Sequence, residues 1–156
     1  IIDGADELDF VVNYQAFQKG DVEGVRTQIN ACTALCLNNG KVAKWIIEIA
    51  ALSDKEIASL TSLIREEVEQ SFPNEVQQVF VKSSTGFYQR FDGGPVGATL
   101  SAVKIMKDNA GKLPIKAAGG VRNIEDVKRM LNLGVSRIGT SSAKQIILGE
   151  QTTKEY

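Results

Sequence analysis

The chain alternates short apolar segments with longer amphipathic ones, and this alternation restricts its possible folds more than any other feature. The pattern repeats five times without a proline- or serine-rich linker or a low-complexity stretch. Such alternation favours a parallel sheet covered by helices, because each right-handed crossover returns the next strand to the same direction. The expected strands are 8–13, 42–49, 78–82, 113–117 and 135–139, and the expected helices are 22–37, 54–70, 100–109, 123–133 and 141–148.

The length and charge of the chain limit the classes of function. The 156 residues are sufficient for one domain with a core, so we expect a single domain over 1–156 with a polar tail at 149–156. A net charge of -1 argues against nucleic-acid binding through a basic field. No apolar run is long enough to span a membrane, and no secretory signal opens the chain. We therefore expect a cytoplasmic protein without a nucleic-acid or membrane partner.

The two cysteines indicate structure rather than metal chemistry. Cys32 and Cys36 are four residues apart in an expected helix, the chain has no histidine, and it has no CxxC motif. A metal site of the Cys/His type is therefore not expected. We interpret both cysteines as small apolar core residues.

Small-residue loops indicate which parallel fold the chain adopts. No G-x-G-x-x-G turn follows the first expected strand, which argues against a doubly wound dinucleotide fold. Instead, "AAGGVRN" and "GTSSA" follow the fourth and fifth strands and lead directly into helices. Loops after the last two strands often bind phosphate in (β/α)₈ barrels, also called TIM barrels. The alternative is that these glycines only form tight turns. We predict a partial (β/α)₈ barrel of about five βα units with a phosphate cradle.

Charged residues share one face of the expected strands. Side chains alternate along a strand, and in the first four strands the helix-facing positions are apolar. The opposite positions are ionisable, which is costly in an interior unless the groups pair, and such clusters often mark functional sites. The alternative is a set of solvated lysines at strand ends. The residues expected to face one interior are Asp9, Lys44, Glu48, Lys82 and Lys116.

This cluster favours amine chemistry. Neighbouring positive charges lower the pKa of a lysine, and a neutral amine can attack a carbonyl to form a Schiff base. A carboxylate such as Asp9 could move protons. Beside a phosphate cradle, the expected substrate is a small phosphorylated sugar.

Several motifs resemble one enzyme family over nearly the whole chain. The segments "GADELDFVVN", "KWIIEIAALSD", "FVKSSTGF", "IKAAGGVRNIEDV" and "RIGTSS" are similar to those of deoxyribose-phosphate aldolases, which are class I aldolases with a (β/α)₈ barrel. The resemblance implies reversible cleavage of 2-deoxyribose 5-phosphate to acetaldehyde and glyceraldehyde 3-phosphate, without a cofactor.

The resemblance also implies a role for individual residues. Lys82 corresponds to the Schiff-base lysine, Lys116 to the neighbour that lowers its pKa, and Asp9 to the proton-relay carboxylate. Lys44 would lie in the site, and Tyr156 would correspond to a C-terminal tyrosine that helps protonate the enamine. The residues implied to hold the phosphate are Gly86, Gly119, Gly120, Ser141 and Ser142.

The sequence also departs from the family pattern. It begins at what resembles the fourth barrel strand, Ser83 replaces the usual threonine, and segment 66–78 is longer than its counterpart. Five βα units would leave two open sheet edges, so we expect either a homo-oligomer or part of a longer chain. Two alternatives to an aldolase stay open: an inactive, aldolase-derived binding protein, and another phosphosugar enzyme on the same barrel.

Overall fold

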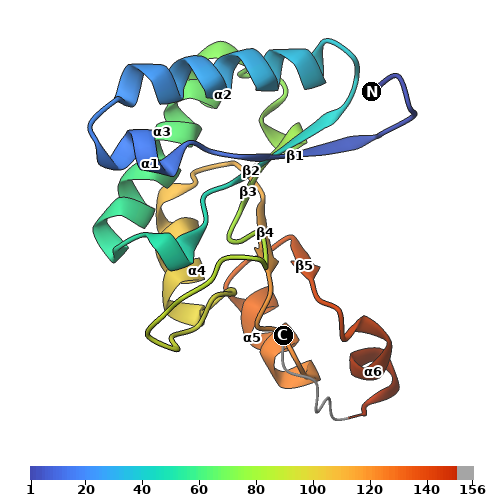
Figure 1. Ribbon diagram of the computed structural model, residues 1–156. Coiled ribbons are helices and arrows are strands. Elements are labelled where there is room, and N and C mark those ends of the chain that lie inside the picture. The colour runs from blue at the N-terminus through green and yellow to red at the C-terminus, as the bar shows by residue number, and fades with distance from the viewer. Residues whose placement is uncertain (151–156) are drawn as a thin grey trace.

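The computed structural model describes residues 1–150 and contains a parallel five-stranded sheet (Figure 1). The strands lie in chain order, β1-β2-β3-β4-β5, and every neighbouring pair is parallel. The expected sheet is therefore confirmed, including the pairing of the first strand with the second. The strands are β1 (Glu7–Val11), β2 (Val42–Ile46), β3 (Val79–Lys82), β4 (Ile115–Ala118) and β5 (Arg137–Gly139).

Helices follow the strands and pack against one another in chain order, α2 on α3, α3 on α4 and α4 on α5. None of the helices in residues 1–150 combines the length and the apolar character needed to cross a bilayer. The helices are α1 (Tyr14–Gln18), α2 (Val22–Leu37), α3 (Asp54–Ser71), α4 (Leu100–Asn109), α5 (Ile124–Asn132) and α6 (Ala143–Leu148), with single 3₁₀ turns at η1 (Ile49–Ala51) and η2 (Val76–Gln78).

Side-chain caps explain where the longer helices begin. Asp21, Thr99 and Asn123 each accept a hydrogen bond from a backbone N–H in the first turn of the following helix. Ser53 and Glu56 form a reciprocal capping box at the start of α3. These caps satisfy N–H groups that have no partner within the helix, so the helix starts are encoded locally.

The core lies between the sheet and the helices. Trp45 on β2 is fully buried, stacks on Phe10 of β1 with ring centroids 5.2 Å apart, and donates from Nε1 to Thr33 Oγ1 of α2 at 2.9 Å. Cys36 is buried in this core, and the half-buried Cys32 packs against the core. Neither cysteine forms a disulfide within the described residues. The apolar, helix-facing side of the strands and the core positions of the cysteines are confirmed.

Several expected boundaries were wrong. The second strand ends at Ile46 rather than 49, because Glu48 adopts a left-handed backbone (φ +56°) and η1 follows. The last strand begins at Arg137, and α6 begins at Ala143 rather than 141. The short helix α1 was not expected, and the long segment 66–78 contains the end of α3 and the turn η2.

Candidate functional site

Asp9 binds two lysines on the concave side of the sheet. Its Oδ1 lies 3.3 Å from Lys44 Nζ, and its Oδ2 accepts a hydrogen bond from Lys82 Nζ at 3.2 Å. Only 9% of the Lys44 side chain and 11% of the Lys82 side chain are exposed. These lysines are therefore buried and paired, rather than solvated at strand ends. Lys116 lies on β4 directly opposite Lys82 in the register.

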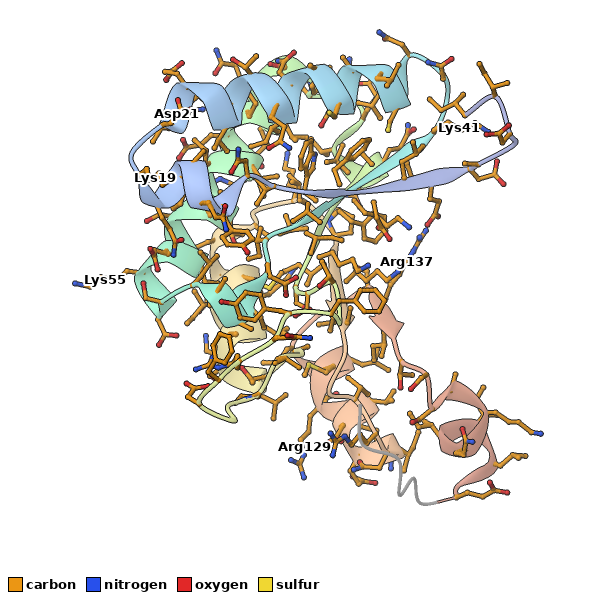
Figure 2. All side chains as sticks on the ribbon, viewed as in Figure 1. Lys19, Asp21, Lys41, Lys55, Arg129 and Arg137 are labelled. Carbon is orange, nitrogen blue, oxygen red and sulfur yellow. The ribbon has the colours of Figure 1, made fainter. Side chains whose placement is uncertain are left out.

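A second ion pair joins the two edges of the sheet across this interior. Arg137 of β5, labelled in Figure 2, donates from Nη1 to both Glu7 oxygens of β1 at 2.6 Å. Its guanidinium lies 4.4 Å above the centre of the Phe80 ring. Glu7 also lies 3.1 Å from Lys44 Nζ. Because β1 and β5 are opposite edges, this contact shows that the sheet is curled.

Sequence reasoning missed both members of this pair. Glu7 lay one residue before the expected first strand, and the alternation of the last strand was not interpreted. That alternation was a usable signal, because Arg137 is in register with Lys116 on the inward side of the neighbouring strand.

The cluster shifts the pKa values of its members in opposite directions. Burial, followed by the charges of Lys44 and Lys82, lowers the pKa of Lys116, and the nearby Asp9 and Glu7 only partly oppose this. Burial raises the pKa of Asp9, but the hydrogen bond from Lys82 and the charges of both its lysine partners outweigh burial, so its pKa lies below the usual value. Hydrogen bonds from Arg137 and Lys44 lower the pKa of Glu7.

We expect Lys116 to lose its proton at a lower pH than a lysine in a model peptide, whose pKa is about 10.4. The reason is that burial and two nearby cations both disfavour its charged form. The measurement is a titration of the ¹³Cε resonances of ¹³C-labelled lysine, with the Lys116 signal assigned by its disappearance in Lys116→Leu. A midpoint at or above the peptide value would contradict the expected coupling.

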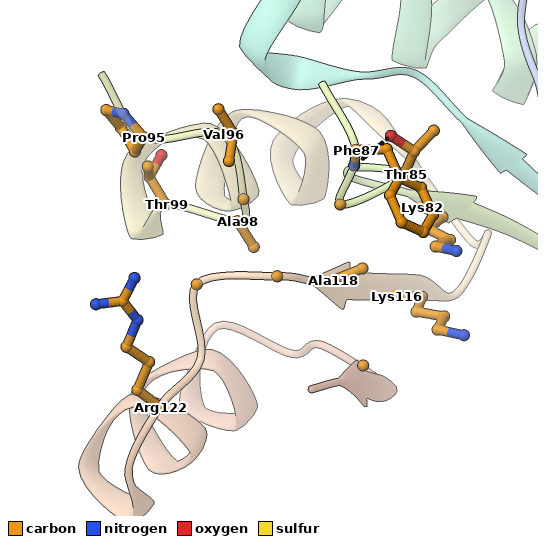
Figure 3. Close-up of a pocket in the computed structure, with 15 residues that line it drawn as sticks. Lys82, Thr85, Phe87, Pro95, Val96, Ala98, Thr99, Lys116, Ala118 and Arg122 are labelled. Carbon is orange, nitrogen blue, oxygen red and sulfur yellow. Dashed lines mark hydrogen bonds between the residues drawn. The ribbon is translucent and has the colours of Figure 1, made fainter. Parts of the chain in front are cut away.

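A cavity of about 530 Å³ opens beside Lys82 and Lys116. The two lysines lie at one end of it and Arg122 at the other (Figure 3). Its remaining lining residues are Thr85, Gly86, Phe87, Pro95, Val96, Gly97, Ala98, Thr99, Ala118, Gly119, Gly120 and Gly139.

Close backbone approach shapes the glycine-lined wall of the cavity. Gly119 and Gly120 both have positive φ angles, +74° and +75°. A Cβ on Gly97 would lie 2.5 Å from the carbonyl carbon of Gly119, so only glycine fits where these two loops meet. Gly97 was not singled out from the sequence, although it lies in a visibly glycine-rich loop.

Some of the residues expected to bind phosphate line the cavity, and others do not. Gly86, Gly119 and Gly120 line it, but the expected phosphate contacts Ser141 and Ser142 do not. Ser141 is exposed, while Ser142 is buried and donates from its backbone N to Thr140 Oγ1, so this link folds on itself. Their binding role stays a prediction.

Glu48 and Tyr156 are the two remaining residues that the sequence predicted at the site. Glu48 does not join the lysines; its carboxylate binds Thr85 instead. It does so because its left-handed backbone interrupts the alternation of β2. Tyr156 lies outside the described residues.

Comparisons with known proteins agree with this arrangement. No protein-family model matches the sequence. A deoxyribose-phosphate aldolase of Staphylococcus haemolyticus is 40% identical over 157 residues, which cover 100% of this chain and 64% of that protein. The chain is homologous to deoxyribose-phosphate aldolases. It spans 64% of the length of this curated relative.

Solved aldolase structures show the same fold. An aldolase named QR15 superposes with a TM-score of 0.71 at 30% identity, covering 96% of this chain and 64% of that one. A tetrameric deoxyribose phosphate aldolase from Aeropyrum pernix gives a TM-score of 0.71 at 27% identity, covering 93% of this chain and 55% of that one. The predicted family resemblance and α/β barrel fold are confirmed.

Proposed function

We propose that the chain carries the Schiff-base site of a class I aldolase that cleaves 2-deoxyribose 5-phosphate to acetaldehyde and glyceraldehyde 3-phosphate. The observation that supports this most is the placement of Lys82: its amine contacts Asp9, faces Lys116 on the next strand and opens into a glycine-lined cavity. The homology to deoxyribose-phosphate aldolases supports the same assignment. The structural unit would be a single incomplete barrel domain.

The proposed reaction begins at Lys82. Its deprotonated amine attacks the C1 aldehyde of the open-chain sugar to form a carbinolamine. A proton delivered through Asp9 lets the carbinolamine hydroxyl leave as water, and a protonated imine forms. The Asp9 carboxylate then accepts the proton of the C3 hydroxyl as the C2–C3 bond breaks, and the imine accepts the electron pair, so that glyceraldehyde 3-phosphate leaves and an enamine stays on Lys82. Protonation of the enamine at C2 and hydrolysis release acetaldehyde and restore the amine.

The other charged groups would support this sequence of steps. Asp9 accepts a hydrogen bond from Lys82 Nζ, so it is placed to take a proton from the ammonium and to return one later. Lys44 keeps Asp9 ionised through its charge. When Lys116 is protonated, its charge on the neighbouring strand would disfavour a second positive charge at the reacting amine.

We propose that the substrate phosphate binds at the glycine-rich wall. Gly86, Gly119 and Gly120 line the cavity, and backbone N–H groups in such loops suit phosphate oxygens. Ser141 and Ser142 are proposed to join them, and Tyr156 to assist enamine protonation. No cofactor is required by this scheme. The tetrameric Aeropyrum pernix aldolase supports a homo-oligomer, and no nucleic-acid or membrane partner is proposed.

Borohydride trapping tests the proposed nucleophile. Incubation with deoxyribose 5-phosphate and borohydride should reduce the imine to a stable secondary amine, and peptide mass spectrometry should locate it on Lys82. Lys116→Leu should still form the adduct on Lys82. The pH optimum of adduct formation should move to higher pH, because the variant lacks the positive charge of Lys116. Lys82→Met should form none. An adduct confined to Lys116 or Lys44 would contradict the assignment.

A second candidate, binding of a phosphosugar without turnover, is favoured by one observation. The match covers 64% of its relative's length, so the homology supports binding and turnover for only part of that aldolase. Saturable binding of deoxyribose 5-phosphate by calorimetry, without a trapped adduct, would favour this candidate or another phosphosugar enzyme.

A further inference from the structure

Glu48 has two unfavourable features in the folded protein. It is 3% exposed, and it is the only non-glycine with a positive φ among residues 1–150. Its Oε1 is buried and has no hydrogen-bond partner among the described residues. Left-handed backbone at a residue with a Cβ, and a buried carboxylate oxygen without a partner, both destabilise the folded state. A glycine at this position would avoid both.

The other carboxylate oxygen of Glu48 holds a turn at the cavity. Glu48 Oε2 accepts hydrogen bonds from the backbone N of Thr85, at 3.2 Å, and from Thr85 Oγ1. Thr85 Oγ1 in turn accepts a hydrogen bond from Phe87 N at 3.0 Å. Thr85, Gly86 and Phe87 all line the cavity, and Thr85 and Phe87 lie at its Lys82 end (Figure 3).

We propose that Glu48 is a positioning residue that fixes the turn formed by Thr85, Gly86 and Phe87 as a preformed wall of the cavity. Buried strain and unpaired polar groups persist where the surrounding structure gains a specific arrangement from them. Here the Glu48 carboxylate accepts hydrogen bonds from both the backbone N and the hydroxyl of Thr85. The Thr85 hydroxyl, oriented in this way, accepts a hydrogen bond from Phe87 N. The turn therefore depends on a side chain from the end of a different strand, β2.

The consequence for ligand binding rests on the proposed function. A wall that is ordered before the sugar binds does not have to be ordered during binding, so its loss should weaken binding more than it slows the chemistry on Lys82. Glu48 touches neither lysine in the structure, so its effect would pass through Thr85 and Phe87.

Amide hydrogen exchange, measured by NMR on the full chain, tests the positioning role directly. In Glu48→Ala, the amides of Thr85 and Phe87 should exchange at least about tenfold faster. Thr85→Val removes the hydroxyl that accepts from Phe87 N, and it should accelerate exchange of the Phe87 amide to a similar extent. Thr85→Ser keeps a hydroxyl and should show the parent exchange rate. Glu56→Ala, which removes a carboxylate from the α3 capping box, serves as the matched control and should leave Phe87 unchanged.

The functional arm measures the rate of borohydride trapping against deoxyribose 5-phosphate concentration. Glu48→Ala should raise the half-saturating concentration at least about tenfold and change the saturating rate much less. Unchanged Phe87 exchange in both Glu48→Ala and Thr85→Val would overturn the positioning role, as would a fall in saturating rate alone. If the parent chain traps no sugar, the proposed function fails, and the exchange rates still decide the role of Glu48.

Discussion

Replacing Asp9 with Asn should reduce the rate of borohydride-trapped imine formation by about 10²–10⁴, the usual range for loss of a positioned acid–base group. Asn removes the negative charge that lies against both Lys82 and Lys44, and it cannot take a proton from either. The measurement is the initial trapping rate at saturating deoxyribose 5-phosphate. A rate within a factor of three of the parent would show that Asp9 is not the proton relay.

The same substitution should destabilise the fold in a pH-dependent way. The folded-state pKa of Asp9 is lowered, so its contribution to stability is present above the unfolded pKa of about 3.9 and is lost as pH falls through the folded value. The Asp9 side chain is 38% exposed, and solvent screening limits the loss to about 1 kcal/mol at neutral pH. Urea unfolding over a pH series should show the largest difference between parent and variant at pH 7, and the difference should shrink as the pH is lowered through the folded pKa of Asp9.

Asp6→Asn is the matched control for both measurements. Asp6 is an exposed carboxylate just before β1 that pairs with Lys41 at 3.0 Å, away from the cavity lining. It should retain the parent trapping rate. Similar losses in both variants would indicate a general charge effect rather than a specific role of Asp9.

The purified 156-residue chain should associate rather than remain a monomer. Within the described residues, β1 and β5 each pair with one neighbour only, and the open side of the sheet exposes 45% of Val11 on β1. Unpaired strand edges template association, and each buried apolar Å² contributes roughly 25 cal/mol. Light scattering over a concentration series should give a mass above 16.9 kDa.

Two variants distinguish association through the open side of the sheet, where Val11 is exposed, from nonspecific hydrophobic association. Val11→Lys places a charge on that face and should lower the average mass. Leu35→Lys adds the same charge at an exposed apolar residue of α2, 53% exposed, and should leave the mass unchanged. A monomeric parent with a cooperative thermal transition would show that the curled sheet, with its Arg137–Glu7 pair, is self-sufficient.

Much of this protein could be predicted from local sequence. The five strand–helix repeats determine a parallel sheet, because this order allows little else. Caps such as Asp21 and Thr99 determine helix starts through hydrogen bonds to the next turn. The alternation in the strands placed Asp9, Lys44 and Lys82 on one face, and the structure brings them into contact. These features depend on residues that are close in the sequence, so they can be predicted from the sequence alone.

Other features depend on contacts that only the tertiary structure decides. The pairing of Glu7 with Arg137, 130 positions later, follows from the curl of the whole sheet, which no local pattern records. Glu48 continued the inward alternation in the sequence, but a left-handed backbone directs it to Thr85, a residue from the loop after the next strand. The serines near the last helix do not line the cavity, and Ser142 N instead donates to Thr140 Oγ1 within the same link. In each case the deciding partner lies on another element or inside an irregular loop, where periodicity carries no information about direction.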